Sequence, residues 1–281
     1  MFRYRLLTAV IGIPAGLLLI YAGGWRLAAV AALLTIGGLS ELYRLLAARE
    51  RLVYARLGYA LACVLLAATA MVPAPRPAFG SLAVEAGLVV IAMAAAGRWL
   101  LARSVAPTGR RLFDTLAAQI YVPQMLSYLL RLRAVPGASI ALGSVLVPAG
   151  ACWTAAVMVV VWGMDTAAYG VGKAIGRRKL CPTISPGKTV EGAVAALAAA
   201  VALTAGAGHW LGLPLVHGVV LGMMLGVVGQ VGDLFESALK RAARVKDSGA
   251  LLPGHGGLLD RFDSLIFVAP VAYYYLAGVF R

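Results

Sequence analysis

Residues Gly232 to Asp263 read GDLFESALKRAARVKDSGALLPGHGGLLDRFD. This stretch holds five of the eleven acidic residues, five Lys or Arg residues and one of the three histidines, although apolar segments flank it on both sides. Ionisable side chains are expensive beside a bilayer and tend to serve a function there. We therefore expect an active site in this stretch, held in place by the surrounding apolar segments.

The rest of the chain is strongly apolar. Of its 281 residues, 62% are hydrophobic and 13% are charged, against about 45–50% apolar residues in soluble domains. One span needs about 20 apolar residues, so the sequence predicts an all-α, polytopic membrane bundle with about nine spans. The expected spans are 6–24, 26–47, 56–72, 82–101, 113–132, 138–162, 190–211, 214–236 and 262–280, and the sixth is expected to continue as a helix toward Gly176.

Loop charges indicate the orientation. If successive loops alternate sides, 20 of the 25 Lys and Arg residues lie on one side of the membrane. Because basic loops stay in the cytoplasm, the N-terminus and the charged stretch are expected there, with Arg281 outside. The net charge of +14 then favours anionic lipid surfaces and phosphorylated substrates as partners, rather than nucleic acid.

No soluble domain is evident. Residues 1–135 are interpreted as N-terminal scaffold helices and 136–281 as C-terminal helices that carry the charged stretch. The first apolar segment is expected to remain as a span, since it exceeds a typical signal-peptide core and no cleavage site follows. Cys63, Cys152 and Cys181 are odd in number and far apart, which argues against disulfides and structural zinc.

Three glycines follow one another at helical spacing in the eighth expected span. Gly218, Gly222 and Gly226 form a stripe of small residues, which in lipid allows two helix backbones to approach closely. Close packing is the favoured interpretation, and it would seat the helix that carries Asp233 tightly against its neighbours.

The charged stretch predicts a site for a divalent cation and phosphates. Oxygen ligands suit Mg²⁺, which usually takes one or two carboxylates plus substrate phosphates, and nearby Lys and Arg would neutralise the remaining charge. Salt bridges that close the helix ends are the alternative, which is weak for the cluster as a whole. The side chains on one face of the eighth helix are Asp233, Glu236, Ser237 and Lys240, while Asp260 and Asp263 share a face if the last helix has begun.

The turn between these carboxylates reads LPGHGG. Its backbone N–H groups could approach an oxyanion closely, because glycine allows unusual backbone angles. His255 stands alone among the glycines, so a turn histidine that makes one backbone hydrogen bond is favoured over a metal ligand.

A second polar cluster covers residues 163–192. Asp165 and Tyr169 are four residues apart, and Gly172 and Gly176 continue their helical face, which would let a nucleotide or another helix approach. The segment SPGKT is not a phosphate-binding P-loop, because Pro182 replaces its first glycine and no buried strand precedes it. The lysine of this segment, Lys188, either binds a phosphate as a point charge or lies in a loop that contacts anionic headgroups.

Three further acidic residues lie in or beside apolar spans. Glu41, Glu85 and Asp114 are expected to pair with nearby arginines such as Arg44 and Arg111. No chemistry is assigned to them.

The segment from Ser237 to Asp263 resembles the signature of the phosphatidate cytidylyltransferases, or CDP-diacylglycerol synthases. The upstream segments DTAAY, KLCPTISPGKTVEG and GDLFES are similar to that family as well, so the resemblance covers about 163–270. Residues 1–130 match only as a run of apolar spans. The fixed positions of the signature fall on Ser237, Lys240, Arg241, Lys246, Asp247, His255, Gly256, Gly257, Asp260, Arg261 and Asp263.

The resemblance implies the reaction of CTP with phosphatidate to give CDP-diacylglycerol and pyrophosphate. It also implies Mg²⁺, alone or with a second cation, and a polytopic homodimer whose polar funnel opens to the cytoplasm. Separately, the arginine-rich composition, the modest length and the lack of an evident extra domain lead us to expect a bacterial inner-membrane protein. Its metal ligands carry over to Asp233 and Asp260. The catalytic set it implies is Asp233, Lys240, Arg241, Asp247, Asp260, Arg261 and Asp263, and the substrate site is Asp165, Tyr169, Ser185, Lys188, Thr189, Ser237, Lys246, His255, Gly256 and Gly257.

Two kinds of alternative remain open at this point. A CTP-dependent lipid kinase, or a cytidylyltransferase for another lipid phosphate, would use a similar cluster. A secondary transporter of an anionic metabolite would also need many spans and intramembrane charges. Against transport, the chain lacks two matched halves with paired broken helices, which are the best sequence indication of a transport site.

Overall fold

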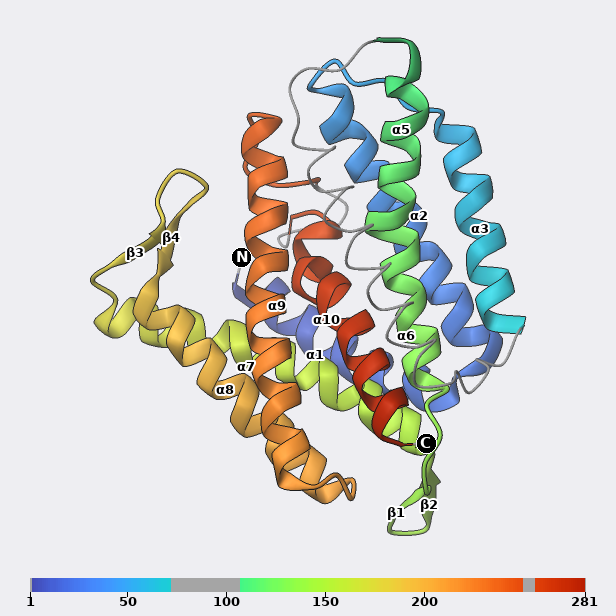
Figure 1. Cartoon of the computed structure of the whole chain (residues 1–281), viewed down its shortest axis with the longest axis vertical. Coiled ribbons are helices and arrows are strands. Elements are labelled where there is room, and N and C mark those ends of the chain that lie inside the picture. The colour runs from blue at the N-terminus through green and yellow to red at the C-terminus, as the bar shows by residue number, and fades with distance from the viewer. Residues whose placement is uncertain (1, 72–106, 250–255, 281) are drawn as a thin grey trace.

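A computed structural model of the chain describes residues 2–71, 107–249 and 256–280. The described part is almost entirely helical, which confirms the all-α class (Figure 1). The expected span at 82–101, Glu85 and His255 lie outside the described residues.

Five described helices are long and apolar enough to cross a membrane. They are α2 (Gly24–Ala47), α7 (Ala149–Ile175), α8 (Val190–Trp210), α9 (Leu215–Ala242) and α10 (Leu259–Val279). The other helices are α1 (Phe2–Ala22), α3 (Ala55–Met71), α5 (Pro107–Gln119) and α6 (Met125–Arg133), with a π-helical turn η1 (Ile120–Gln124) between the last two. These helices are those of a multi-pass membrane protein.

The sequence predicted that the sixth span would begin at residue 138, and this start was wrong. Residues there form a hairpin of β1 (Ile140–Leu142) and β2 (Val145–Val147), which turns at Gly143 with a φ of 61°. Helix α7 begins only after Pro148, whose missing N–H costs nothing at a helix start, and it then continues to Ile175 as expected.

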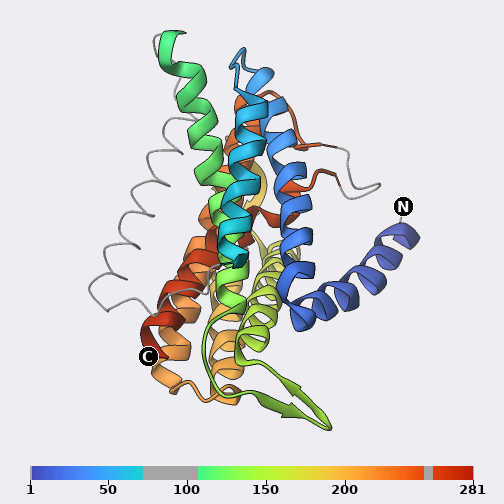
Figure 2. The same ribbon diagram turned by 90° about the vertical axis from the view of Figure 1, so that its right-hand side faces the viewer.

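Helix α10 runs through the centre of the bundle, where it packs against α9, α6, α7 and α2 (Figure 1). Its residues Ile266, Val268, Ala272 and Leu276 are completely buried. By contrast, α1 points away from the bundle like an arm (Figure 2). The helix that carries Asp260 is therefore largely enclosed by the other described helices.

Helices α8 and α9 approach each other along the glycine stripe, which confirms the close packing expected from the sequence. A Cβ atom on Gly222 would lie 2.6 Å from Val201 Cα, and one on Gly218 would lie 2.9 Å from Ala205 Cα. Side chains at these positions would separate the helices and displace the polar end of α9.

A second hairpin connects α7 to α8. It consists of β3 (Lys179–Cys181) and β4 (Ser185–Thr189), and the SPGKT segment is the second strand. Thr189 then caps α8, since its Oγ1 accepts a hydrogen bond of 3.1 Å from the Gly192 N–H.

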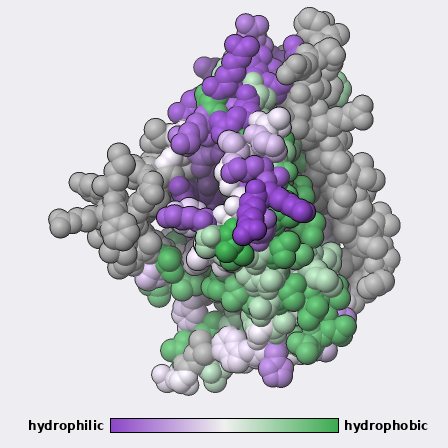
Figure 3. All heavy atoms as spheres, turned by 90° about the vertical axis from the view of Figure 1, so that its left-hand side faces the viewer, coloured by the Kyte–Doolittle hydropathy of each residue, from purple (hydrophilic) through white to green (hydrophobic). Residues whose placement is uncertain are grey.

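Hydrophilic side chains gather over the upper part of the surface seen in Figure 3, and apolar side chains cover the lower part. The β3–β4 hairpin, the end of α9 and the start of α10 all lie in the upper half of Figure 1. The residues expected to carry chemistry thus belong to one end of the bundle.

Candidate functional site

A cavity of about 450 Å³ opens between α7, α8, α9 and the β3–β4 hairpin. It brings together residues from three separate sequence segments that were all assigned to the site. Those that line it are Asp165, Tyr169, Ser185, Lys188, Thr189 and Asp233.

Glycines make room for this cavity. Gly172 of α7 and Gly192 of α8 face each other, since a Cβ on Gly192 would lie 3.4 Å from Gly172 Cα. Gly229 of α9 also lines the cavity. The sequence predicted that the glycine face of α7 would let a nucleotide or another helix approach. Of its two glycines, Gly172 lines the cavity, whereas Gly176 packs so closely against Thr189 that a Cβ would contact it.

An ion pair connects the hairpin to α9 across the cavity. Lys188 Nζ lies 2.5 Å from Asp233 Oδ2, and the two side chains are 25% and 30% exposed. This pair is accessible from the cavity. A phosphate that enters the cavity can therefore contact the Lys188 ammonium, and a cation can contact the Asp233 carboxylate.

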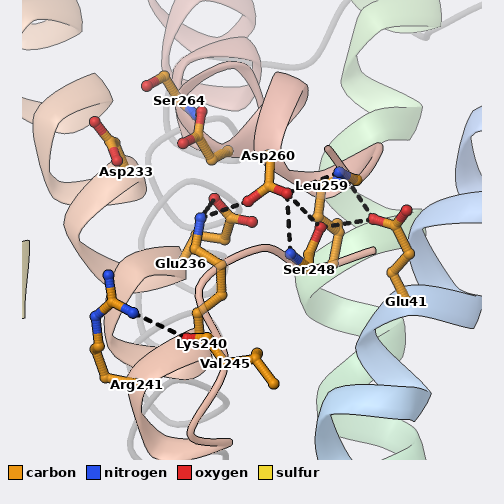
Figure 4. Close-up of polar contacts among 12 residues, drawn as sticks. Glu41, Asp233, Glu236, Lys240, Arg241, Val245, Ser248, Leu259, Asp260 and Ser264 are labelled. Atoms are coloured by element: carbon orange, nitrogen blue, oxygen red, sulfur yellow. Dashed lines mark hydrogen bonds and ion pairs between the residues drawn. The ribbon is translucent and has the colours of Figure 1, made fainter. Parts of the chain in front are cut away.

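A second network joins α9 to the first turn of α10 (Figure 4). Lys240 Nζ donates to Glu236 Oε2 at 3.1 Å and to Asp260 Oδ1 at 2.5 Å. Glu236 is fully buried, and the Lys240 and Asp260 side chains are only about a tenth exposed. The single ammonium thus holds two carboxylates together in a partly dehydrated setting, where electrostatic attraction is stronger than in water.

The other oxygen of Asp260 is held by the loop before α10. Asp260 Oδ2 accepts hydrogen bonds from the Ser248 N–H at 2.9 Å, the Gly257 N–H at 2.8 Å and the Ser248 hydroxyl at 3.1 Å. The backbone N–H of the glycine turn therefore binds a carboxylate of the chain itself. Gly256, with a φ of 81°, supplies the left-handed backbone that this turn needs.

Glu41 is a residue that the sequence interpretation missed. It was expected to pair with Arg44, but its carboxylate is completely buried and accepts hydrogen bonds from Leu258 N–H, Leu259 N–H and the Ser248 hydroxyl. Arg44 instead donates to Ser40 O. Only the placement of an acid within an apolar run could have indicated it, because Glu41 and Leu258 are 217 residues apart.

The expected partner of Asp114 was wrong too. Asp114 pairs with Arg51 at 3.0 Å, and both side chains are buried. Arg111 instead donates to Val53 O at 3.2 Å. This pair belongs to the packing of α5 against the turn after α2, away from the cavity.

The remaining residues assigned to the site lie around these two networks. Arg241 donates to Ile184 O and Val245 O, which ties the end of α9 to the hairpin and to the following loop. Lys246 and Asp247 are exposed in that loop, and Ser237 is buried on α9. Asp165 lies within the electrostatic range of Arg261, and Asp263 within that of Asp165 and Asp233.

The carboxylates of this region fit a hard divalent cation by their chemistry. Asp165, Asp233 and Asp263 are close enough for their charges to repel one another, and Glu236 Oε1 is buried with no hydrogen-bond partner among the described residues. In the described part of the chain, no group of three or more ligating side chains is already assembled around one point. Substrate oxygens would complete such a site, as is usual for Mg²⁺.

Comparison with known proteins identifies the family. The pattern of the cytidylyltransferase family matches residues 3–279. A phosphatidate cytidylyltransferase of Synechocystis is 33% identical over 97% of this chain and 95% of its own length. The phosphatidate cytidylyltransferase of Bacillus subtilis is 51% identical over 42% of this chain and 45% of its own length. The one of Brucella suis is 50% identical over 41% of this chain and 43% of its own length.

The match with the Bacillus and Brucella enzymes spans less than half of each relative, whereas that with the Synechocystis enzyme spans nearly all of it. The family pattern likewise includes the N-terminal helices, which the resemblance from the sequence alone left out. The chain belongs to the cytidylyltransferase family.

Proposed function

We propose that this protein transfers the cytidylyl group of CTP to phosphatidate, which yields CDP-diacylglycerol and pyrophosphate for phospholipid synthesis. The observation that carries this proposal is the polar cavity at one end of an apolar bundle, where Lys188 meets Asp233. A soluble nucleotide and a lipid phosphate can meet there, because the cavity lies beside helices that suit a bilayer.

The reaction is a displacement at phosphorus. An oxygen of the lipid phosphate forms a new bond to the α-phosphorus of CTP, and the bond from that phosphorus to the bridging oxygen of pyrophosphate breaks. The lipid phosphate is already an anion at neutral pH, so no strong general base is required. The main barrier is the approach of two anions, which cationic side chains lower.

The lysines that now neutralise carboxylates are the proposed phosphate ligands. Lys188 lines the cavity and forms an ion pair with Asp233, while Lys240 forms one with Asp260. Exchange of these partners for phosphate oxygens would free both carboxylates for a cation. Arg241, Lys246 and Arg261 surround the same region and are proposed to bind the departing pyrophosphate and the lipid phosphate.

Asp233 and Asp260 are the proposed ligands of Mg²⁺, alone or with a second cation. When bound, Mg²⁺ would screen the negative charge on the reacting phosphates. Asp263 lies within the electrostatic range of Asp233, and Glu236 within that of Asp260. The proposed role of the chain's own residues is to bind and orient the phosphates.

The proposed setting is a bacterial inner membrane. Nine spans, with the N-terminus and the polar end in the cytoplasm and the C-terminus outside, agree with the distribution of Lys and Arg along the sequence. A homodimer is proposed from the family resemblance alone.

The test is an assay of the detergent-purified protein with phosphatidate, Mg²⁺ and CTP that is labelled separately in the cytidine and in the γ-phosphate. The proposal expects cytidine label in the lipid, pyrophosphate release and loss of both with EDTA. Transfer of the γ-phosphate label to lipid would instead identify a lipid kinase. Substrate flux in proteoliposomes without CTP turnover would identify a transporter.

A further inference from the structure

Glu41 makes an unusual set of contacts for an acid on a membrane-type helix. Its side chain is 0% exposed, and no Lys or Arg of the described residues lies within ion-pair distance of it. Its carboxylate is instead stabilised by three donors: Leu258 N–H at 2.8 Å, Leu259 N–H at 2.9 Å and the Ser248 hydroxyl at 2.8 Å. Two of these donors, Leu258 and Leu259, stand at the start of α10, and the third is Ser248.

These contacts supply a cap that α10 lacks in its own sequence. The residue before the helix is Leu258, whose side chain makes no capping hydrogen bond. The first N–H groups of a helix need partners, and its N-terminus favours a negative charge. Glu41 on α2 provides both the hydrogen-bond acceptor and the negative charge, and it thereby fixes the position of the first turn of α10.

The loop is shaped around this carboxylate. A Cβ atom on Gly249 would lie 2.5 Å from Glu41 Oε1, and one on Gly257 would lie 2.6 Å from Glu41 Oε2. Neither position could hold a side chain without displacing Glu41. Gly249 and Gly257 therefore both pack directly against the acid.

Ser248 connects Glu41 to Asp260. Its hydroxyl lies 2.8 Å from Glu41 Oε2 and 3.1 Å from Asp260 Oδ2, and its N–H donates to the same Asp260 oxygen at 2.9 Å (Figure 4). A hydroxyl has one proton to donate, so the two carboxylates share it. Asp260 is thus held by Lys240 on one oxygen and by the Glu41-supported loop on the other.

We propose that Glu41 is a positioning residue for Asp260, which it orients through the Ser248 hydroxyl and through the first turn of α10. This inference rests on the proposed function, in which Asp260 is a cation ligand. It assigns a role in the reaction to α2, which the sequence interpretation treated as scaffold only. Misplacement of a reacting group by about 1 Å can cost about 100-fold in rate.

The experiment compares four purified variants of the full chain with the wild type: Glu41→Gln, Ser248→Ala, the double variant, and Asp114→Asn as the matched control. Asp114 is a second fully buried carboxylate of the N-terminal half, away from the cavity. Each variant is measured for kcat, for KM with CTP, for the Mg²⁺ concentration at half-maximal rate and for thermal unfolding.

The inference expects kcat of Glu41→Gln to fall about 10- to 100-fold, with a raised Mg²⁺ requirement and little change in KM for CTP. Ser248→Ala should lose activity in the same way, and the double variant should be no worse than Glu41→Gln, because coupled residues are not additive. Asp114→Asn should unfold at a lower temperature yet keep the Mg²⁺ requirement of the wild type.

Three results separate the possibilities. A wild-type protein without cytidylyl transfer would overturn the proposed function itself. An active wild type, with Glu41→Gln unchanged in kcat and Mg²⁺ requirement, would overturn only this inference. If Glu41→Gln does not fold, Ser248→Ala is the deciding variant, because it keeps the hydrogen bonds from the start of α10 to Glu41. Unchanged kinetics in Ser248→Ala would then overturn the proposed connection between Glu41 and Asp260.

Discussion

Lys188 on β4 and Asp233 on α9 line the cavity and form an ion pair of 2.5 Å with each other. The pair joins the hairpin to the helix, although 45 positions separate the two residues in the sequence. The ion pair also engages the ammonium and the carboxylate that the proposed reaction needs, so a phosphate or a cation must compete with it.

Replacement of Lys188 by alanine should remove a phosphate ligand and leave Asp233 without its partner. We expect the ratio kcat/KM for CTP to fall by about 100-fold, as for loss of one preorganised donor to a reacting oxyanion. Steady-state kinetics with CTP measures this. Lys179→Ala is the matched control, because Lys179 is exposed on the adjoining strand β3 and does not line the cavity, and equal losses in both variants would contradict the prediction.

Neutralisation of Asp233 or Asp260 should abolish the proposed reaction. Asp233→Asn and Asp260→Asn each remove a proposed cation ligand, and a loss of at least about 100-fold in kcat is expected. Pyrophosphate release at several Mg²⁺ concentrations is the measurement. Glu50→Gln, an exposed acid in the turn after α2, should keep full activity, whereas full activity in both aspartate variants would remove the metal assignment.

The glycine stripe also predicts an effect on the stability of the protein. Gly222→Ala places a Cβ 2.6 Å from Val201 Cα, and such overpacking costs about 1–3 kcal/mol. Thermal unfolding in detergent should show it. Gly206→Ala is the control on α8, since its Cβ would meet nothing within 4 Å, and it should be neutral or stabilising because alanine is the better helix former.

The buried pair of Arg51 and Asp114 predicts an asymmetry between single and double replacements. Asp114→Ala alone removes the carboxylate that pairs with the buried Arg51 guanidinium and should destabilise the protein by about 3–5 kcal/mol. The double variant Arg51→Met with Asp114→Leu should recover most of this loss, because apolar residues can replace a buried pair. Unfolding temperatures of the three proteins test it, and a double variant as unstable as the single one would contradict the argument.

The apolar runs of the sequence predicted most described helices well. The expected span 190–211 corresponds to α8 at Val190–Trp210, since a continuous apolar segment of that length has few other structures open to it in lipid. The β1–β2 hairpin was missed because its residues are as apolar as a span. Only Gly143 and Pro148 mark it.

The site was predictable in part. The residues of the charged stretch were expected to lie together because helical spacing puts them on one face, and Asp233 of that stretch lines the cavity together with Asp165 and Lys188. The ion pairs that actually form, such as Lys188 with Asp233, were not predictable, since they depend on how α7, α8 and α9 pack. Glu41 was missed for the same reason, because spacing along one helix carries no information about α10.

The position of Asp260 and Asp263 at the start of α10 has a consequence for biosynthesis. During translation these acids emerge after every other described helix, and their surroundings are complete only once α10 has inserted beside α9 and α2. A nascent chain that stalls before residue 259 would lack both carboxylates. Incomplete copies in the membrane would thus lack one of the two proposed cation ligands, so the proposed reaction would begin only after synthesis of α10.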